Sequence, residues 1–180
     1  MKKLILFGLI FIASVSLFAQ TADKIETEYY GLKWGCSPAE LKAKYPAVYS
    51  DGENKDGDEI YYLDTNDTRR VFFFGNNKLY MGRIVYEDCS AEKIKALGEK
   101  ISNTYGKFNN YSKGSSEGNE YFILTKQYSS KICIEFQVTD IKNLYGYTVS
   151  ELVMVTYINN DLAAQIQQDR INKMQDDLEI

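Results

Sequence analysis

The sequence predicts an α+β domain in which helices lie on one face of an antiparallel sheet. A capping box marks the start of one helix and apolar spacing indicates a second, and each is followed by short strands that are separated by turn residues. The order helix, strand, strand, strand occurs twice, and a helix-forming tail over 161–180 follows. We therefore expect two helix-plus-three-strand modules that share one antiparallel sheet, with a C-terminal helix added.

A capping box marks the start of the first helix. Ser37 can accept a hydrogen bond from the helix backbone, Glu40 can reach back to the Ser37 amide, and Pro38 suits the first helical position. The helix is short because Pro46 cannot continue it. An aromatic strand is expected before it, over Glu26–Trp34.

Three strands are expected after this helix. An acidic, glycine-containing loop over Asp51–Glu59 precedes them, and it lacks the ligands of an EF-hand calcium loop, with Gly52 at the first position and Leu63 at the last. Gly75-Asn76-Asn77 predicts a hairpin turn, since glycine and asparagine tolerate positive φ. The expected strands are Glu59–Leu63, Arg70–Phe74 and Lys78–Tyr86.

The second half repeats this plan. Ser90 caps a helix whose apolar residues recur at three- and four-residue spacing, and Gly106 suits its C-terminal end. A polar loop is expected over Asn109–Gly118, and a connection through Tyr145-Gly146-Tyr147 before the last strand. The expected strands are Glu120–Thr125, Lys131–Val138 and Glu151–Ile158.

The two halves, 30–88 and 89–158, are similar in sequence as well as in plan. Cys36–Lys42 (CSPAELK) resembles Cys89–Lys95 (CSAEKIK), and each segment opens a helix. The three strands that follow also correspond in order. An internal duplication explains this similarity, and the alternative is chance, because short amphipathic strands look alike.

The segment Gly31–Leu41 (GLKWGCSPAEL) resembles a stretch found just before a helix in a recurring type of exported bacterial protein with tandem helix-plus-three-strand modules. The twofold plan is also similar to the β-lactamase-inhibitor protein and to the small lipoproteins of the outer-membrane barrel-assembly machine. The resemblance implies a non-enzymatic binding module. The chain differs from those lipoproteins because its first cysteine, Cys36, is too far downstream to be lipidated.

Residues 1–19 have the three parts of a secretory signal peptide. Two lysines form a basic start, Leu4–Leu17 is a nearly continuous apolar run, and Ala19 offers a small residue for cleavage. An uncleaved membrane anchor is the alternative, but it needs about 18 to 20 apolar residues. We expect cleavage to leave a domain over 20–160 and a helix over 161–180, in the bacterial periplasm or outside the cell, with no membrane span remaining.

Composition excludes several function classes. The chain has no histidine, which excludes Ser-His-Asp and Cys-His catalysis and His-containing zinc sites, and three cysteines cannot form a Cys₄ site. After cleavage, 19 basic and 25 acidic residues remain, a net charge near −6 with no clustered basic face, so we expect no nucleic-acid partner. We expect no metal or other cofactor. Carboxylate-only chemistry such as glycoside hydrolysis stays open.

Aromatic residues are concentrated in the first-half strands. Because neighbouring strand residues point to opposite faces, these aromatics are expected on both faces of the sheet. A partner or an apolar ligand would cover the second face unless the other half or the C-terminal helix does so. For the tryptophan, a packing role at the strand-to-helix corner is the alternative. The candidate interaction residues are Trp34, Tyr61, Tyr62, Phe72, Phe73 and Phe74.

Three cysteines in an oxidising compartment allow one disulfide and one leftover thiol. Cys36 and Cys89 occupy matching places in the two halves and are the candidate pair, whereas Cys133 lies in a predicted strand. Three buried, unpaired thiols are the alternative.

These features favour an exported, non-enzymatic module that binds another envelope or secreted protein. One alternative is a small-molecule or lipid-binding periplasmic domain, which needs an internal apolar cavity of roughly 300 Å³ or more. The other is a carboxylate-dependent hydrolase, which needs two acids about 5 to 9.5 Å apart in a cleft.

Overall fold

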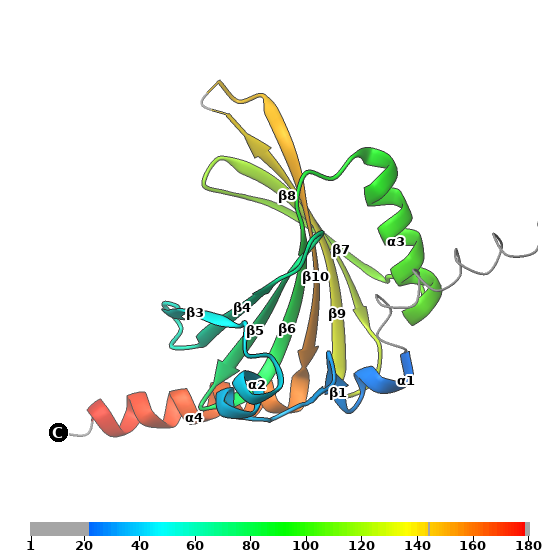
Figure 1. Ribbon diagram of the computed structural model, residues 1–180. Helices are drawn as coiled ribbons and strands as arrows, with labels where there is room; N and C mark the ends of the chain where they lie inside the picture. The colour runs from blue at the N-terminus through cyan, green and yellow to red at the C-terminus, as the bar shows by residue number, and fades with distance from the viewer. Residues whose placement is uncertain (1–21, 144, 179–180) are drawn as a thin grey trace, which may run out of the picture.

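The computed structural model describes residues 22–143 and 145–178, and the predicted signal peptide over 1–19 lies outside them. Eight antiparallel strands form one sheet in the order β3-β4-β5-β6-β10-β9-β8-β7 (Figure 1). The two central strands, β6 (Lys78–Tyr86) and β10 (Thr148–Asn159), are the last strands of the two halves and pair with each other. The α+β class and the antiparallel sheet are therefore confirmed.

Each half contributes four strands to this sheet rather than the predicted three. β3 (Tyr49–Glu53) and β7 (Asn110–Ser116) are the edge strands, and they form where the sequence predicts polar loops over Asp51–Glu59 and Asn109–Gly118. Both are exposed along almost their whole length, so neither has the apolar alternation that predicts a strand. Four strands of the sheet therefore follow each of the two helices, rather than the predicted three.

The remaining strands lie close to their predicted positions, and the predicted β5–β6 turn is confirmed by positive φ at Asn76 and Asn77. These strands are β4 (Glu59–Asp64), β5 (Arg69–Gly75), β8 (Asn119–Gln127) and β9 (Ile132–Lys142).

Two helices pack on one face of the sheet, as predicted. α2 (Pro38–Lys44) begins at the predicted capping box, in which Ser37 makes both reciprocal hydrogen bonds. α3 (Ala91–Tyr105) is capped by Ser90 and ends at Gly106, whose φ of +92° favours glycine.

The predicted opening strand over Glu26–Trp34 is instead a tight hairpin of β1 (Glu28–Tyr29) and β2 (Leu32–Lys33), which follows the short helix α1 (Ala22–Ile25). Its turn residues, Tyr30 and Gly31, both have positive φ, as a two-residue hairpin turn requires.

This hairpin places one aromatic ring at the centre of the sheet. Tyr29 lies on Gly82, where a Cβ atom would be 2.3 Å from the tyrosine ring, so only glycine fits there. The Tyr29 ring also contacts aromatic rings from both halves of the chain: Trp34, Phe72 and Tyr157.

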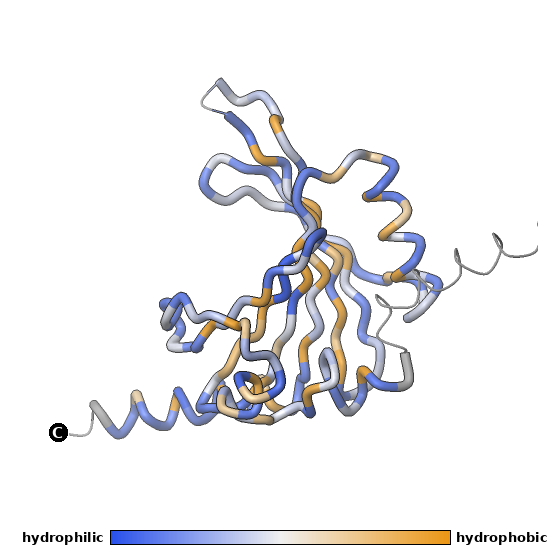
Figure 2. The backbone as a smooth tube through the Cα atoms, in the orientation of Figure 1, coloured by the Kyte–Doolittle hydropathy of each residue, from blue (hydrophilic) through white to orange (hydrophobic). Residues whose placement is uncertain are grey.

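The core lies between the sheet and α2 and α3. Alternate residues of β9 face it, and each of their side chains is at most 2% exposed: Ile132, Ile134, Phe136 and Val138. Figure 2 shows apolar residues concentrated in the central strands, whereas the C-terminal helix is mostly polar.

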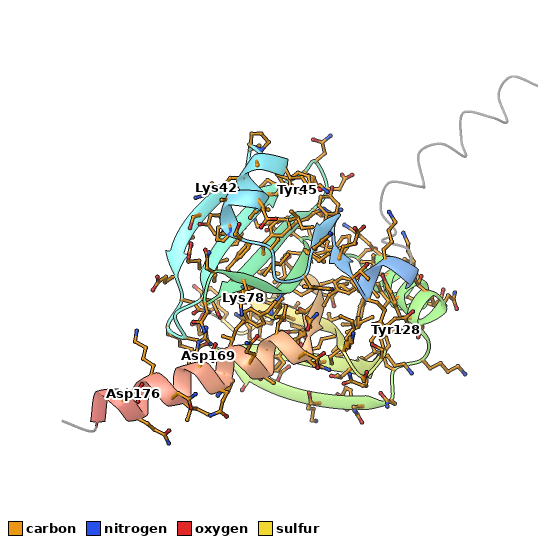
Figure 3. All side chains as sticks on the ribbon, turned by 90° about the horizontal axis from the view of Figure 1, so that it is seen from below. Lys42, Tyr45, Lys78, Tyr128, Asp169 and Asp176 are labelled. Atoms are coloured by element: carbon orange, nitrogen blue, oxygen red, sulfur yellow. The ribbon has the colours of Figure 1, made fainter. Side chains whose placement is uncertain are left out.

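The C-terminal helix, α4 (Asn160–Leu178), follows β10 directly and reaches the other face of the sheet. Ile166 is 2% exposed and packs over Gly75, the last residue of β5. Seen from below in Figure 3, α4 with Asp169 and α2 with Lys42 lie on opposite sides of the sheet. The C-terminal part of α4 projects beyond the strands (Figure 1).

Candidate functional site

Three of the predicted interaction residues lie in the core. Tyr61, Phe72 and Phe74 are 4%, 0% and 1% exposed and belong to the buried cluster that includes Leu41 of α2. They cannot contact a partner, so the predicted surface is corrected. The physical reason is that the alternation of strand side chains sends every second residue of an aromatic run into the core.

Tyr62 and Phe73 lie on the opposite face, because they occupy the alternate positions of β4 and β5. Phe73 is buried, and the Arg83 guanidinium lies 5.3 Å from its ring centre. Tyr62 is half-buried and stacks on Tyr49, with ring centres 5.5 Å apart. Neighbouring side chains therefore cover much of this aromatic surface.

Trp34 has the contacts of a packing residue at the corner between β2 and α2. Its indole N–H donates to the Ile25 carbonyl at 2.7 Å, and its ring stacks on Tyr29 with the centres 5.9 Å apart. Both contacts are intramolecular, so they favour the packing alternative over a binding anchor.

A buried carboxylate, that of Asp58, joins α4 to the sheet on the face that carries Tyr62 and Phe73. Asp58 is 3% exposed and accepts hydrogen bonds from the Tyr80 hydroxyl at 2.9 Å and the Asn54 amide at 3.1 Å. Its Oδ1 atom pairs with the Arg170 guanidinium of α4. Burial, and then the Asp58 charge, raise the pKa of Tyr80 well above its usual range, so this phenol stays protonated and donates. With Ile166, this network covers the first-half sheet at the end of β5.

The three cysteines are free thiols. The Cys36 carbonyl accepts from the Leu79 amide at the start of β6, whereas Cys89 follows the end of that strand. A strand rises about 3.3 Å per residue, so β6 separates the two by about 20 Å, well beyond the roughly 7 Å that a disulfide spans between Cα atoms. The structure therefore contains no Cys36–Cys89 bridge.

Burial is the main cause that raises the pKa of all three thiols, those of Cys36, Cys89 and Cys133. The pKa of Cys36 rises to about 11. The thiolate is the nucleophilic form, and it is scarce at neutral pH when the pKa is raised.

The second half differs because its large apolar side chains are exposed. Of the six such residues in the described part of the chain, four belong to β7 and the β9–β10 hairpin. They are Tyr145 (86% exposed), Tyr147 (72%), Tyr111 (64%) and Val149 (61%).

Tyr145 and Tyr147 are held at the tip of the β9–β10 hairpin, which projects beyond the body of the sheet (Figure 1). The Asn143 side-chain oxygen accepts from both tyrosine amides, at 2.9 and 3.1 Å, and the Asn143 amide donates to the Tyr147 carbonyl at 2.9 Å. Gly146 completes the turn with a φ of +80°. These bonds tie Tyr145 and Tyr147 to Asn143, and both tyrosine rings are exposed.

A hollow of about 450 Å³ lies over β7, β8 and β9. On β8 and β9, Glu120 and Asp140 are direct cross-strand neighbours, and the Lys142 ammonium lies 3.1 Å from Glu120. The hollow therefore extends from Tyr111 toward the hairpin tip. Its lining combines apolar and charged residues: Tyr111, Lys113, Gly114, Ser115, Glu120, Tyr121, Phe122, Val138 and Asp140.

Sequence reasoning misses this region. Tyr111 falls in a predicted polar loop, and Tyr145-Gly146-Tyr147 is predicted only as a connection. The available signal was the pair Asn143 and Gly146, which are turn formers and flank a tyrosine. That signal locates a turn but does not show that the turn projects into solvent.

Within the described ranges, no three side chains of His, Cys, Asp or Glu are grouped closely enough to hold a metal ion. Among the helices that the structure describes, none combines the length and the apolar composition needed to cross a bilayer.

Comparisons with models of protein families, with curated proteins and with solved structures found no match for this chain. The candidate site therefore rests on the geometry described above.

Proposed function

We propose that this protein is an exported, non-enzymatic module that binds another protein of the bacterial envelope through its β7–β10 half. The exposure of Tyr111, Tyr145 and Tyr147 carries the proposal. Tyrosine is enriched at protein interfaces because it offers a large apolar ring with few rotatable bonds and a hydroxyl that can stay wet. Exposed apolar residues that gather in one half of a domain favour an interaction site there.

Two further features support a binding role. The Asn143 side chain holds the amides of Tyr145 and Tyr147, which lowers the cost of ordering these two residues on binding. The adjacent hollow offers a concave place in which a partner side chain can be buried, as interface anchors usually are.

Export is part of this proposal and depends on residues 1–19. We expect the chain recovered from the envelope or the medium to begin at about Gln20. N-terminal sequencing by mass spectrometry checks this. Full-length chain with Met1 among the soluble cytosolic proteins would contradict it.

We also infer that 30–88 and 89–158 are copies of one helix-plus-four-strand unit. The strand order supports this, because the fourth strands of the two halves meet at the centre of the sheet and the first strands form its edges. Superposition of the two halves tests it. A shared chain path would support duplication, and an opposite hand of the helix-to-sheet crossing would contradict it.

A small molecule or lipid is the second candidate ligand, and the hollow favours it, because ligand pockets commonly enclose about 300–1,000 Å³. Phe122→Trp separates the two proposals, since it adds a larger ring to the lining and leaves the tip loop unchanged. It should abolish the binding of a small ligand and reduce partner capture far less than loss of Tyr145 and Tyr147 does.

The proposed function is tested by capturing proteins from the cell's own envelope fraction with tagged mature protein. We expect one stoichiometric partner with the wild type and its loss with the double variant Tyr145→Ser/Tyr147→Ser. Tyr49→Ser is the matched control, because it removes an exposed tyrosine (47%) from the opposite edge of the sheet. Equal capture by the double variant, or loss only with Tyr49→Ser, would contradict the proposal.

A further inference from the structure

The two edge strands differ in whether another strand can pair with them. β3 has only five residues, its register shifts between Ser50 and Gly52, and Gly52 has a φ of +88°. Asp51 and Glu53 add two exposed negative charges. Short length, bulges and charges are the features that prevent edge strands from pairing with other chains. β3 is therefore closed to strand addition.

β7 has fewer of these protective features. Its seven residues pair with β8 in one unbroken register, and Lys113 is its single charged residue. Gly114 is covered on one face by Tyr121, since a Cβ atom there would lie 2.6 Å from the tyrosine hydroxyl. In the described part of the chain, no strand lies on the outer side of β7. A regular, exposed edge is left open.

The turn between β7 and β8 shows which backbone groups point outward. Glu117 and Gly118 both have positive φ and form a two-residue turn, so Ser116 and Asn119 are the first hydrogen-bonded pair of the ladder. Hydrogen-bonded and non-hydrogen-bonded pairs alternate along an antiparallel ladder. The backbone amides and carbonyls of three β7 residues therefore point away from β8: Tyr111, Lys113 and Ser115.

The same three residues line the hollow. Side chains directly opposite on a paired strand lie about 4.5–5.5 Å apart. The residues opposite Tyr111 and Lys113 would therefore decide which sequence fits. Lys113 is exposed and makes no ion pair within the described residues. An acid opposite Lys113 and an apolar residue opposite Tyr111, two positions along, are complementary to this edge.

A second copy of the chain fits this edge poorly. The antiparallel self-pairing with the longest overlap aligns Asn110 with Ser116 and brings Lys113 opposite the same lysine of the other copy. Like charges directly opposite each other destabilise a strand pair. The edge therefore favours a strand from a different protein.

We propose that β7 binds an extended segment of the partner protein as a ninth strand, with an acidic residue of that segment opposite Lys113 and an apolar residue opposite Tyr111. Backbone hydrogen bonds would supply affinity and the two side-chain positions specificity, as in other cases of strand addition. This inference rests on the proposed protein-binding function and names the binding segment of the partner.

Selection from a random heptapeptide library displayed on phage, against immobilised mature protein, is the first test. We expect enrichment of β-branched and aromatic residues, with Asp or Glu two positions from an apolar residue. A labelled synthetic peptide of the enriched sequence then serves as the probe in fluorescence anisotropy.

The variant Lys113→Pro distinguishes peptide binding through backbone hydrogen bonds from peptide binding through side chains. Lys113→Pro should weaken peptide binding by about tenfold or more, because it removes an outward N–H and leaves the β8 ladder intact. Lys113→Ala keeps that N–H and should weaken binding by only about threefold, with a loss of salt dependence. In the wild type, the peptide should slow amide exchange at Tyr111, Lys113 and Ser115. That measurement decides the question without a variant if the proline variant fails to fold.

Several outcomes would overturn the proposal. They are the absence of any enriched peptide, a helical or proline-rich consensus, unchanged amide exchange at β7, and equal peptide binding by a folded Lys113→Pro variant. A dimer that light scattering detects and Lys113→Pro dissociates would make a second copy the occupant instead. If the envelope partner is lost with Tyr145→Ser/Tyr147→Ser but kept with Lys113→Pro, the proposed function stands and strand addition fails.

Discussion

The β3–β6 half and the β7–β10 half contain similar elements but present different surfaces to solvent. In the first half, Phe72 and Phe74 are in the core, and α4 covers part of the other face through Ile166. Its edge strand is short and bulged. In the second half, aromatic rings are exposed at Tyr111 and on a projecting hairpin, and the edge strand is regular.

This difference shows that a high density of aromatic residues does not by itself mark a binding surface. Three consecutive phenylalanines lie in β5, a strand with a neighbouring strand on each side. All three are buried. Single tyrosines at a strand edge or a hairpin tip have no such cover. The position of a residue in the sheet decides whether it stabilises the fold or meets a partner.

The largest expected effect is on the free energy of unfolding, and it should differ between an aromatic residue of the first half and one of the second. Phe72→Ala should lower the free energy of unfolding by about 3–5 kcal/mol, because it leaves a cavity in a fully buried site. Tyr147→Ala, at a residue that is 72% exposed, should change it by no more than about 0.5 kcal/mol. Urea denaturation measures both values. Similar values for the two variants would break the contrast between the halves.

Alkaline pH should destabilise the shared centre of the sheet. Burial is the main cause that raises the pKa of Tyr29 and of Tyr157 well above the usual value. The folded state therefore holds these protons more tightly than the unfolded state. Stability is complete below the unfolded pKa of about 10 and falls above it by up to about 1.4 kcal/mol per pH unit for each phenol.

Denaturation at a series of pH values from 8 to about 12 tests this linkage, with Tyr29→Phe as the comparison variant. That variant cannot ionise at position 29 and should lose stability less steeply above pH 10 than the wild type. Identical slopes would show that Tyr29 ionises freely in the folded protein.

The attachment of α4 should depend on the carboxylate that holds it. Asp58→Ala should cost about 2–3 kcal/mol, because it leaves the partly buried Tyr80 hydroxyl and the Arg170 guanidinium without their acceptor. Limited proteolysis should then cut α4 faster. Asp169→Ala is the matched control on the same helix, since Asp169 is exposed and makes one hydrogen bond to Asn76. Equal effects of the two variants would contradict the anchoring role of Asp58.

A smaller effect distinguishes the two helix caps. Ser37 takes part in a complete capping box, whereas Ser90 accepts one bond, from the Lys93 amide at 3.3 Å. Hydrogen bonds to Glu40 lower the pKa of its carboxyl group; the bond from the Ser37 amide is the main cause and the bond from the Ser37 hydroxyl the second. The Glu40 part of the capping box is therefore lost only as pH falls below the usual carboxyl range. Ser37→Ala should cost about 1 kcal/mol and Ser90→Ala less. The reverse order in thermal unfolding would contradict this comparison.

Much of the fold could be predicted from local signals. The Ser37 box, the Ser90 cap and the Asn76-Asn77 turn are short-range patterns, and the structure has each of them. The edge strands could not be predicted, because β3 and β7 are exposed on both faces and have a polar loop composition. The Tyr30-Gly31 turn was missed because tyrosine rarely adopts positive φ.

The candidate site was harder to predict than the fold. The alternation of strand side chains predicts that Phe72 and Phe73 point to opposite faces of the sheet. Which face is covered depends on packing between distant segments, such as α4 on β5. The exposure of Tyr145 depends on how far its hairpin extends beyond neighbouring strands. No local pattern in the sequence encodes that distance.

Deuterium exchange of the mature protein, alone and with its captured partner, tests most directly the claim that the β7–β10 half is the binding surface. The account predicts slower exchange on binding in 110–116 and 141–150, with no change in 49–53. Protection confined to 49–53 or to α2, with 110–116 and 141–150 unchanged, would contradict it.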